Sequence, residues 1–138
     1  MTIELEKQLQ KEFPFMSNCH GAYQYNYEDK TAPVPCECND GWYNIIYELC
    51  QGIQKILSEN NDCILTMCQV KEKFGSLCFY YDFCGPREVS DKIDDLIDVA
   101  EGKSIVTCEW CGKPGKMRKG GWMLCLCDEC ENNRRTKK

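Results

Sequence analysis

The sequence predicts an α+β fold, in which amphipathic helices pack on an antiparallel β-hairpin and a cysteine-rich module follows on the carboxy-terminal side. Three observations predict this fold. Residues 42–60 have apolar side chains at the spacing of one helical stripe, and residues 63–83 contain two β-branched and aromatic runs around Gly75. Residues 108–130 contain two CxxC pairs. A chain of 138 residues is long enough for one such domain with a small appendage.

The helix expected at residues 42–60 is the centre of the predicted core. Its apolar residues recur at helical intervals from Trp42 to Leu57, so they form one continuous stripe. We expect Trp42 to lie in the core at the end of this stripe, rather than to serve as a stacking platform. Asn39 or Asp40 is expected to cap the first turn through a side-chain oxygen.

Two further helices are predicted. Residues 2–12 have the pattern of a short amphipathic helix, and residues 87–104 also have helical apolar spacing. Ser90 is expected to cap the second of these helices, and Gly102 is expected to end it. The outer face of this helix carries five acidic residues, which are Asp91, Asp94, Asp95, Asp98 and Glu101. Such a face is either simply solvated or able to bind a basic partner.

The two CxxC pairs predict a structural zinc site. Cys108 and Cys111 form the first pair, and Cys127 and Cys130 form the second pair after a short loop. Two such knuckles aim four thiolates at one point and fill the tetrahedral shell of Zn²⁺, which gives a zinc-ribbon or knuckle module. Paired disulfides or uncoordinated reduced thiols are the alternatives. Cys125 adds an ambiguity, because it could replace Cys127 as a ligand or pack as a small apolar residue.

The segment of residues 13–41 is expected to be an irregular loop that is rich in aromatic residues. A loop of this length in a compact domain is often functional, metal-bound or mobile. It contains three thiols and the one histidine of the chain, which are sufficient ligands for a second Zn²⁺, although their spacing is not a common one. These candidate ligands are Cys19, His20, Cys36 and Cys38. Otherwise, the four side chains pack or stay reduced.

Composition and charge restrict the functional classes. The first residues are charged and lack an apolar signal-peptide region, and no apolar run approaches about 18 residues, so we expect a cytoplasmic protein outside the membrane. The 13 cysteines are then expected to be thiols or metal ligands. Residues 1–102 contain 8 basic and 18 acidic residues, whereas residues 103–138 contain 9 basic and 4 acidic residues. The expected organisation is an acidic body (1–104), a zinc-binding module (105–131) and a frayed basic tail (132–138).

Three stretches together resemble a known family. DGWYNIIYELCQGI, QVKEKFGSLCFYYD and CEWCGKPGKMRKGGWMLCLCDEC follow one another in the order found in a family of small proteins encoded by bacteriophages and prophages. The resemblance covers roughly residues 38–130. It implies a phage origin and zinc ligation by the four CxxC cysteines, and it implies no established activity. Where the family commonly has TLCDxC, this chain has CLCDEC, so Cys125 stands where a thiol is not expected.

Catalysis is the least supported class of function. A single histidine beside Cys19 does not make a nucleophile and base pair, and no second set of residues supplies an oxyanion hole. Nucleic-acid binding is better supported, because basic side chains surround the zinc module and tryptophans are available to stack on bases. The candidate contacts are Lys113, Lys116, Arg118, Lys119 and Trp122, with Trp110 nearby and Arg134, Arg135, Lys137 and Lys138 in the tail.

The function that the sequence favours is that of a non-enzymatic phage or prophage accessory protein that binds a host protein or nucleoprotein complex. The acidic helix face would occupy a surface that normally holds nucleic acid, in the manner of anti-CRISPR and related counter-defence inhibitors. The acidic body would repel a nucleic-acid backbone. Direct nucleic-acid binding or transcription regulation by the zinc ribbon is therefore the alternative.

Overall fold

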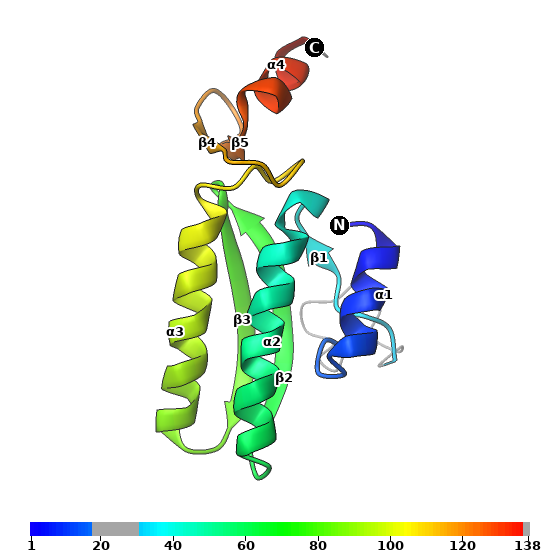
Figure 1. Ribbon diagram of the computed structural model, residues 1–138, viewed down its shortest axis with the longest axis vertical. Coiled ribbons are helices and arrows are strands. Elements are labelled where there is room, and N and C mark those ends of the chain that lie inside the picture. Colours follow the sequence, from blue (N-terminus) through cyan, green and yellow to red (C-terminus); the bar gives the residue numbers. More distant parts are fainter. Residues whose placement is uncertain (18–30, 137–138) are drawn as a thin grey trace.

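The computed structural model describes residues 1–17 and 31–136 and confirms the α+β fold class. Within these residues the chain forms four α-helices, a mixed three-stranded sheet and a separate two-stranded antiparallel hairpin. Helices α2 (Tyr43–Glu59) and α3 (Arg87–Ser104) lie side by side on one face of the three-stranded sheet (Figure 1). The cysteine-rich module stands at the end of the body where α3 finishes (Figure 1). None of the described helices has the length and apolar character that a membrane span requires.

The predicted hairpin is formed by β2 (Ile64–Lys73) and β3 (Ser76–Cys84), which pair in antiparallel orientation. Phe74 and Gly75 make the two-residue turn, and their φ angles are 52° and 83°. Positive φ at both positions matches the twist of a hairpin. Glycine adopts this conformation freely, whereas phenylalanine adopts it at a cost of about 1–2 kcal/mol.

Residues 13–41, which were expected to be irregular, contain a strand that the sequence pattern did not predict. β1 (Cys36–Glu37) pairs in parallel with Val70 and Lys71 of β2. Helix α1 (Ile3–Glu12) lies beside it (Figure 1), and the Glu6 carboxylate accepts a hydrogen bond from the backbone N–H of Cys36 at 2.6 Å. A strand of two residues is too short to show an alternating pattern, so only its partners define it.

Helix α2 follows a 3₁₀ turn, η2 (Asp40–Trp42), and the predicted caps are wrong. Neither Asn39 nor Asp40 caps the helix with its side chain. The Asp40 carboxylate instead accepts a hydrogen bond from the backbone N–H of Thr2 at 2.8 Å. Asn39 donates to the Glu109 carboxylate through its backbone and side-chain N–H groups, at 3.0 and 3.2 Å. Contacts with distant segments therefore replace the local caps.

Helix α3 is longer than predicted at both ends. It begins at Arg87, so Ser90 lies inside it and donates its hydroxyl to the Arg87 carbonyl at 2.9 Å. It continues beyond Gly102 to Ser104, whose hydroxyl accepts a hydrogen bond from the backbone N–H of Leu77 at 3.0 Å. The cap expected at Ser90 and the end expected at Gly102 are both wrong. The contact with β3 stabilises the last turn, which is why the glycine does not end the helix.

The core lies between the two long helices and the three-stranded sheet. The apolar stripe predicted for α2 faces this core, and Trp42 is fully buried, as expected. Fully buried side chains from helices and strands meet there, among them Trp42, Ile46, Ile53, Met67, Val70 and Ile93. Burying such side chains is the main favourable term for folding, about 1.5–3 kcal/mol for each.

The cysteine-rich module consists of a two-stranded hairpin and a helix. β4 (Lys116–Arg118) pairs with β5 (Leu124–Leu126), and α4 (Asp128–Thr136) follows. Residues 132–136, which were expected to begin a frayed tail, are helical. Lys137 and Lys138 lie outside the described residues.

The DGW turn forms the first contact between the body and this module. The backbone N–H of Gly41 donates to the Glu109 carbonyl at 2.8 Å. The indole N–H of Trp42 donates to the Thr107 carbonyl at 3.0 Å. The buried indole thus has the hydrogen-bond partner that a core tryptophan needs.

The tip of the β2–β3 hairpin forms the second contact. A Cβ atom at Gly75 would collide with the Met117 side chain, so the turn and the module lie in close contact. The indole N–H of Trp122 donates to the Glu72 carboxylate at 3.0 Å. The DGW and VKEKFG stretches, far apart in the sequence, therefore both hold the cysteine-rich module.

The first contact leads to a stability prediction for Gly41. A Cβ atom at Gly41 would overlap the carbonyl oxygens of Cys108 and Glu109, which are backbone atoms and cannot rotate aside. We expect Gly41→Ala to lower the free energy of unfolding by about 3 kcal/mol, measured by urea unfolding of the metal-loaded protein. Gly102→Ala is the control, because a Cβ atom there meets nothing within 4 Å. The control should gain about 0.5–1 kcal/mol from the helix propensity of alanine, and equal effects of the two changes would contradict the close approach.

Candidate metal centre and binding surfaces

Four thiols gather in the cysteine-rich module. The Sγ atoms of Cys108, Cys111, Cys127 and Cys130 all lie within 4.8 Å of one another, and those of Cys111 and Cys127 are 3.6 Å apart. A tetrahedron with metal–sulfur bonds of about 2.3 Å has sulfur–sulfur edges of about 3.8 Å. The four thiols can therefore hold one metal ion after small adjustments.

Local structure presents both cysteine pairs. In the first turn, the backbone N–H of Gly112 donates to the Cys108 carbonyl at 2.9 Å, and Gly112 has a φ of 82°, which glycine adopts freely. In the second, Cys127 directly precedes α4, and the backbone N–H of Cys130 donates to its sulfur at 3.4 Å. The amino-terminal end of a helix stabilises negative charge, so this position favours a thiolate.

The electrostatics of the four thiols favour a shared cation. Burial disfavours the Cys108 thiolate, but hydrogen bonds from backbone N–H groups, foremost that of Cys127, outweigh burial and lower the pKa of Cys108 to about 7. Burial and the neighbouring thiols raise the pKa of Cys130. Four thiolates at this separation repel one another, so all four lose their protons only when a metal ion compensates their charge.

Cys125 stands outside this group. Its side chain is fully buried in β5, and its backbone carbonyl accepts a hydrogen bond from the N–H of Glu109 at 2.9 Å. In the structure Cys127, rather than Cys125, completes the set of four. Cys125 packs as a small apolar residue beneath the first knuckle.

The second predicted metal site is only partly described. Cys19 and His20 lie outside the described residues. Cys36 and Cys38 are buried, and burial raises the pKa of both thiols, that of Cys38 to about 12. In the described part of the chain, the set of four cysteines is the one group of three or more His, Cys, Asp or Glu side chains placed to hold a metal ion.

Two acidic side chains of the module, Asp128 and Glu131, form ion pairs with its arginines. Arg118 donates to Asp128 at 2.7 Å and lies 3.8 Å from Glu131. Arg134 donates to Glu131 at 2.9 Å, and Arg135 lies 3.9 Å from the same carboxylate. Glu131 is only 4% exposed, so its charge is held inside a group of cations. Arg118 and Arg134, two of the arginines predicted to contact nucleic acid, are therefore largely buried in ion pairs within the module, whereas Arg135 is exposed.

The lysines of the module are more accessible. Lys113 is exposed and 4.0 Å from Glu129. Lys116 and Lys119 are also exposed, and neither forms an ion pair with another described residue. These three lysines and Arg135, whose side chain is 71% exposed, are the described cations that the module presents to solvent.

Trp122 lies beside a second exposed aromatic ring, which sequence reasoning missed. Phe74, at the tip of the β2–β3 hairpin, is 71% exposed, and Trp122 is 70% exposed. The two residues, with Lys73 and Met123, border a surface pocket of about 340 Å³. The KEKFG turn contained the signal, because a large apolar residue at a hairpin turn is usually exposed. Exposed aromatic rings around a pocket are typical of a binding surface.

All five acidic side chains predicted on the outer face of α3 are exposed, and we call them the α3 acidic face. They are Asp91, Asp94, Asp95, Asp98 and Glu101. Asp94 accepts a hydrogen bond from the Tyr81 hydroxyl at 2.6 Å. Among the residues that the structure describes, none forms an ion pair with these carboxylates. The α3 acidic face is therefore a negative surface without internal compensation.

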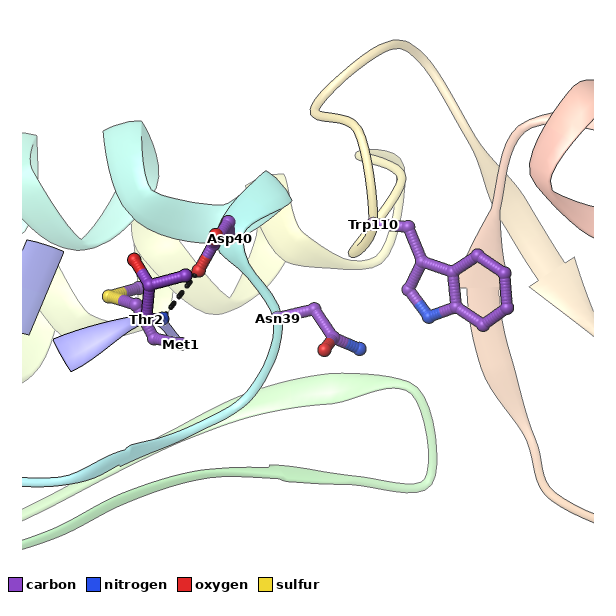
Figure 2. Close-up of a pocket in the computed structure, with 5 residues that line it drawn as sticks. All are labelled: Met1, Thr2, Asn39, Asp40 and Trp110. Atoms are coloured by element: carbon purple, nitrogen blue, oxygen red, sulfur yellow. Dashed lines mark hydrogen bonds between the residues drawn. The ribbon is translucent and has the colours of Figure 1, made fainter. Parts of the chain in front are cut away.

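An open pocket of about 430 Å³ lies between the start of the chain, the DGW turn and the first knuckle. Figure 2 shows Met1, Thr2 and Asp40 on one side and the Trp110 indole on the other, with Asn39 between them. The polar side chains of Asn39 and Asp40 already bind Glu109 and Thr2. This pocket therefore belongs to the junction between the body and the module.

No protein-family model matches the chain, and searches of curated proteins and of solved structures found no similar protein. The functional argument consequently depends on the geometry and charge of the chain itself.

The geometry of the thiols predicts how two neighbouring cysteines differ. We expect elemental analysis of the purified protein to find about one metal ion per chain. Cys127→Ser should reduce the metal content at least tenfold, because it removes one of the four sulfurs. Cys125→Ser is the matched control, and it should keep the metal while losing about 1–3 kcal/mol of stability for its buried hydroxyl. Loss of metal in the Cys125 variant alone would contradict the assignment.

Proposed function

We propose that this protein is a non-enzymatic, zinc-binding accessory protein of a phage or prophage that binds a host protein or nucleoprotein complex through the α3 acidic face. Its partner presents a basic surface, such as one that normally holds nucleic acid. The protein then acts in the cytoplasm of the bacterial host as a counter-defence inhibitor, comparable to anti-CRISPR proteins. The resemblance to the phage family and the charge distribution support this proposal.

Zinc is the metal that best fits the four thiols. A tetrahedral set of four sulfurs is typical of zinc or of iron–sulfur centres, and two CxxC knuckles separated by a short loop are typical of structural zinc. A set of four protein ligands leaves no open position for substrate or water, which supports a structural role and a non-enzymatic function. Zinc in the elemental analysis supports this proposal, and iron in its place contradicts it.

The observation that carries the proposal is the contrast between the two charged surfaces. Arg118 and Arg134 are neutralised inside the module by Asp128 and Glu131. The α3 acidic face has no such compensation among the described residues. Uncompensated carboxylates repel the negative phosphates of a nucleic-acid backbone. The same carboxylates attract and orient a basic partner. The acidic surface is therefore better suited to binding than the basic one.

Charge reversal on α3 tests the proposal. Asp95 and Asp98 are exposed and form no hydrogen bond or ion pair with another described residue, so changing them leaves folding intact. We expect Asp95→Lys with Asp98→Lys to reduce capture of a host partner from bacterial lysate at least tenfold. Quantitative mass spectrometry of proteins retained on the immobilised protein provides the measurement.

The control for this experiment makes the same charge change elsewhere. Glu4 on α1 and Glu59 at the end of α2 are also exposed. Glu4→Lys with Glu59→Lys should keep the partner that the wild-type protein captures. Equal capture by all three proteins, or equal loss in both variants, would count against the α3 acidic face.

A second candidate function is binding of single-stranded nucleic acid. The exposed rings of Phe74 and Trp122, which both line the 340 Å³ pocket, favour it, because unpaired bases stack on such rings. Lys73 borders the same pocket, and Lys119 lies in the same loop as Trp122. These cations are placed to contact the phosphates of a strand whose bases enter the pocket.

Removal of one ring separates this candidate from the main proposal. If the protein binds single strands, Trp122→Ala should weaken binding by about 5- to 150-fold, which corresponds to the 1–3 kcal/mol of one stacked base. Mobility-shift titrations at low and moderate salt measure the effect. Ile64→Ala, which removes another exposed apolar side chain at the far end of the hairpin, is the control. If the wild-type protein binds single strands at micromolar concentration in a salt-sensitive way, and if Trp122→Ala abolishes this binding whereas charge reversal on α3 preserves it, nucleic-acid binding takes the place of the main proposal.

A further inference from the structure

β3 is an edge strand whose outer side has no strand partner in the described part of the chain. The sheet order is β1-β2-β3, so β3 pairs with β2 on one side only. The backbone N–H of Leu77 points away from β2, because it donates to the hydroxyl of Ser104 in α3. Backbone groups alternate in direction along a strand, so Phe79, Tyr81 and Phe83 also direct their N–H and C=O groups outward. Because the Leu77 N–H is already bonded to Ser104, β3 offers the backbone groups of Phe79, Tyr81 and Phe83 for pairing.

Four common protections of an edge strand do not occur on β3, although α3 covers the edge at Leu77. Sheets usually protect their edges with prolines, bulges, very short strands or inward-facing charges. β3 has 9 residues without a proline, and the irregularity in its pairing lies on β2, between Met67 and Gln69. Tyr80 adds an aromatic ring that is 45% exposed beside this edge. The edge is open to the addition of another strand.

A groove separates this edge from α3. Its volume is about 390 Å³, and its lining consists of Phe79, Tyr80, Tyr81, Asp94, Ile97 and Asp98. The hydrogen bond from the Tyr81 hydroxyl holds the Asp94 carboxylate beside the strand. Figure 1 shows α3 running along the length of β3. An added strand would therefore have β3 on one side and carboxylates of the α3 acidic face above it.

The spacing of these carboxylates matches that of a strand. Asp98 lies four positions after Asp94 in α3, and these four positions correspond to a rise of about 6 Å along the helix axis. Alternate residues of a strand are about 6.7 Å apart, and their side chains point to the same face. Lysine or arginine at alternate positions of an added strand would meet one carboxylate each.

We propose that β3 binds an extended basic segment of the partner by strand addition, with alternate lysine or arginine side chains facing Asp94 and Asp98. The inference rests on the proposed function, because it uses the α3 acidic face, and it adds the conformation and charge pattern of the partner. Backbone hydrogen bonds supply affinity, and the carboxylates select basic side chains. A second copy of this chain is a poorer occupant, because pairing of two β3 edges brings two acidic faces together.

N-methylated peptides test strand addition without changing the protein. The probe is a synthetic peptide of alternating lysine and threonine, with one form methylated on the lysine backbone nitrogens and another on the threonine backbone nitrogens. Only alternate residues of an added strand direct their N–H groups to β3. One methylated form should therefore bind at least tenfold more weakly than the unmodified peptide in calorimetric titrations, and the other should stay within about threefold. Amide exchange at Tyr81 and Phe83 should slow at least tenfold when the peptide saturates the protein.

A matched pair of variants tests the role of the groove. Asp98→Asn should weaken binding of the unmodified peptide at least threefold, because Asp98 lines the groove. Asp95→Asn should not, because Asp95 is equally exposed on α3 but does not line the groove.

The outcomes separate this inference from the proposed function. Equal binding of all three peptides, abolished by charge reversal on α3, overturns strand addition and leaves the acidic-face function standing. Failure of the unmodified peptide to bind, with host-partner capture intact, also overturns strand addition. Peptide binding that charge reversal does not affect contradicts the acidic face itself. A dimer with protected β3 amides before peptide is added identifies a second copy as the occupant and overturns the proposal.

Discussion

The close approach of Gly41 to the backbone of Cys108 and Glu109 is the constraint on which the rest of the structure depends. Only a residue without a side chain fits between these carbonyl groups. The approach allows Asn39 to bind the Glu109 carboxylate and Trp42 to reach the Thr107 carbonyl. The same knuckle that supplies two thiols thus supplies the backbone partners of the turn that begins α2. Core packing and the metal centre are consequently parts of one structure.

Local patterns allowed the first three helices, the β2–β3 hairpin and the four cysteines to be predicted, whereas α4 was missed. The spacing of apolar residues predicts α2, and the CxxC spacing predicts the thiol cluster. Each of these patterns depends on residues within a few positions of one another. The features that were missed depend on distant partners. β1 exists because β2 lies beside Cys36, and α3 passes Gly102 because Ser104 meets Leu77. The side-chain cap expected from Asp40 was wrong for the same reason, since its carboxylate binds Thr2 instead.

The charge distribution at the candidate site also could not be predicted without the structure. A count of lysine and arginine makes the carboxy-terminal part look basic, and the sequence gives no sign that Glu131 is buried among Arg118, Arg134 and Arg135. Four thiolates around a divalent metal ion would lower the net charge of the module further. The acidic residues of α3, by contrast, are spaced so that the helix alone places them on one exposed face. Helical periodicity therefore predicts the α3 acidic face, whereas the ion pairs of the module depend on its tertiary fold.

The junction contacts join parts of the chain that a ribosome makes at different times. Trp42 and Thr107 are 65 residues apart, so at roughly 5–20 residues per second the DGW turn waits for several seconds before its partner emerges. The four-sulfur site is completed later still, when Cys130 leaves the exit tunnel. Until the module has been made, the Trp42 indole N–H and the backbone N–H of Gly41 lack the carbonyl groups that they bind in the finished protein. The unfinished body is therefore more accessible to proteases during this time.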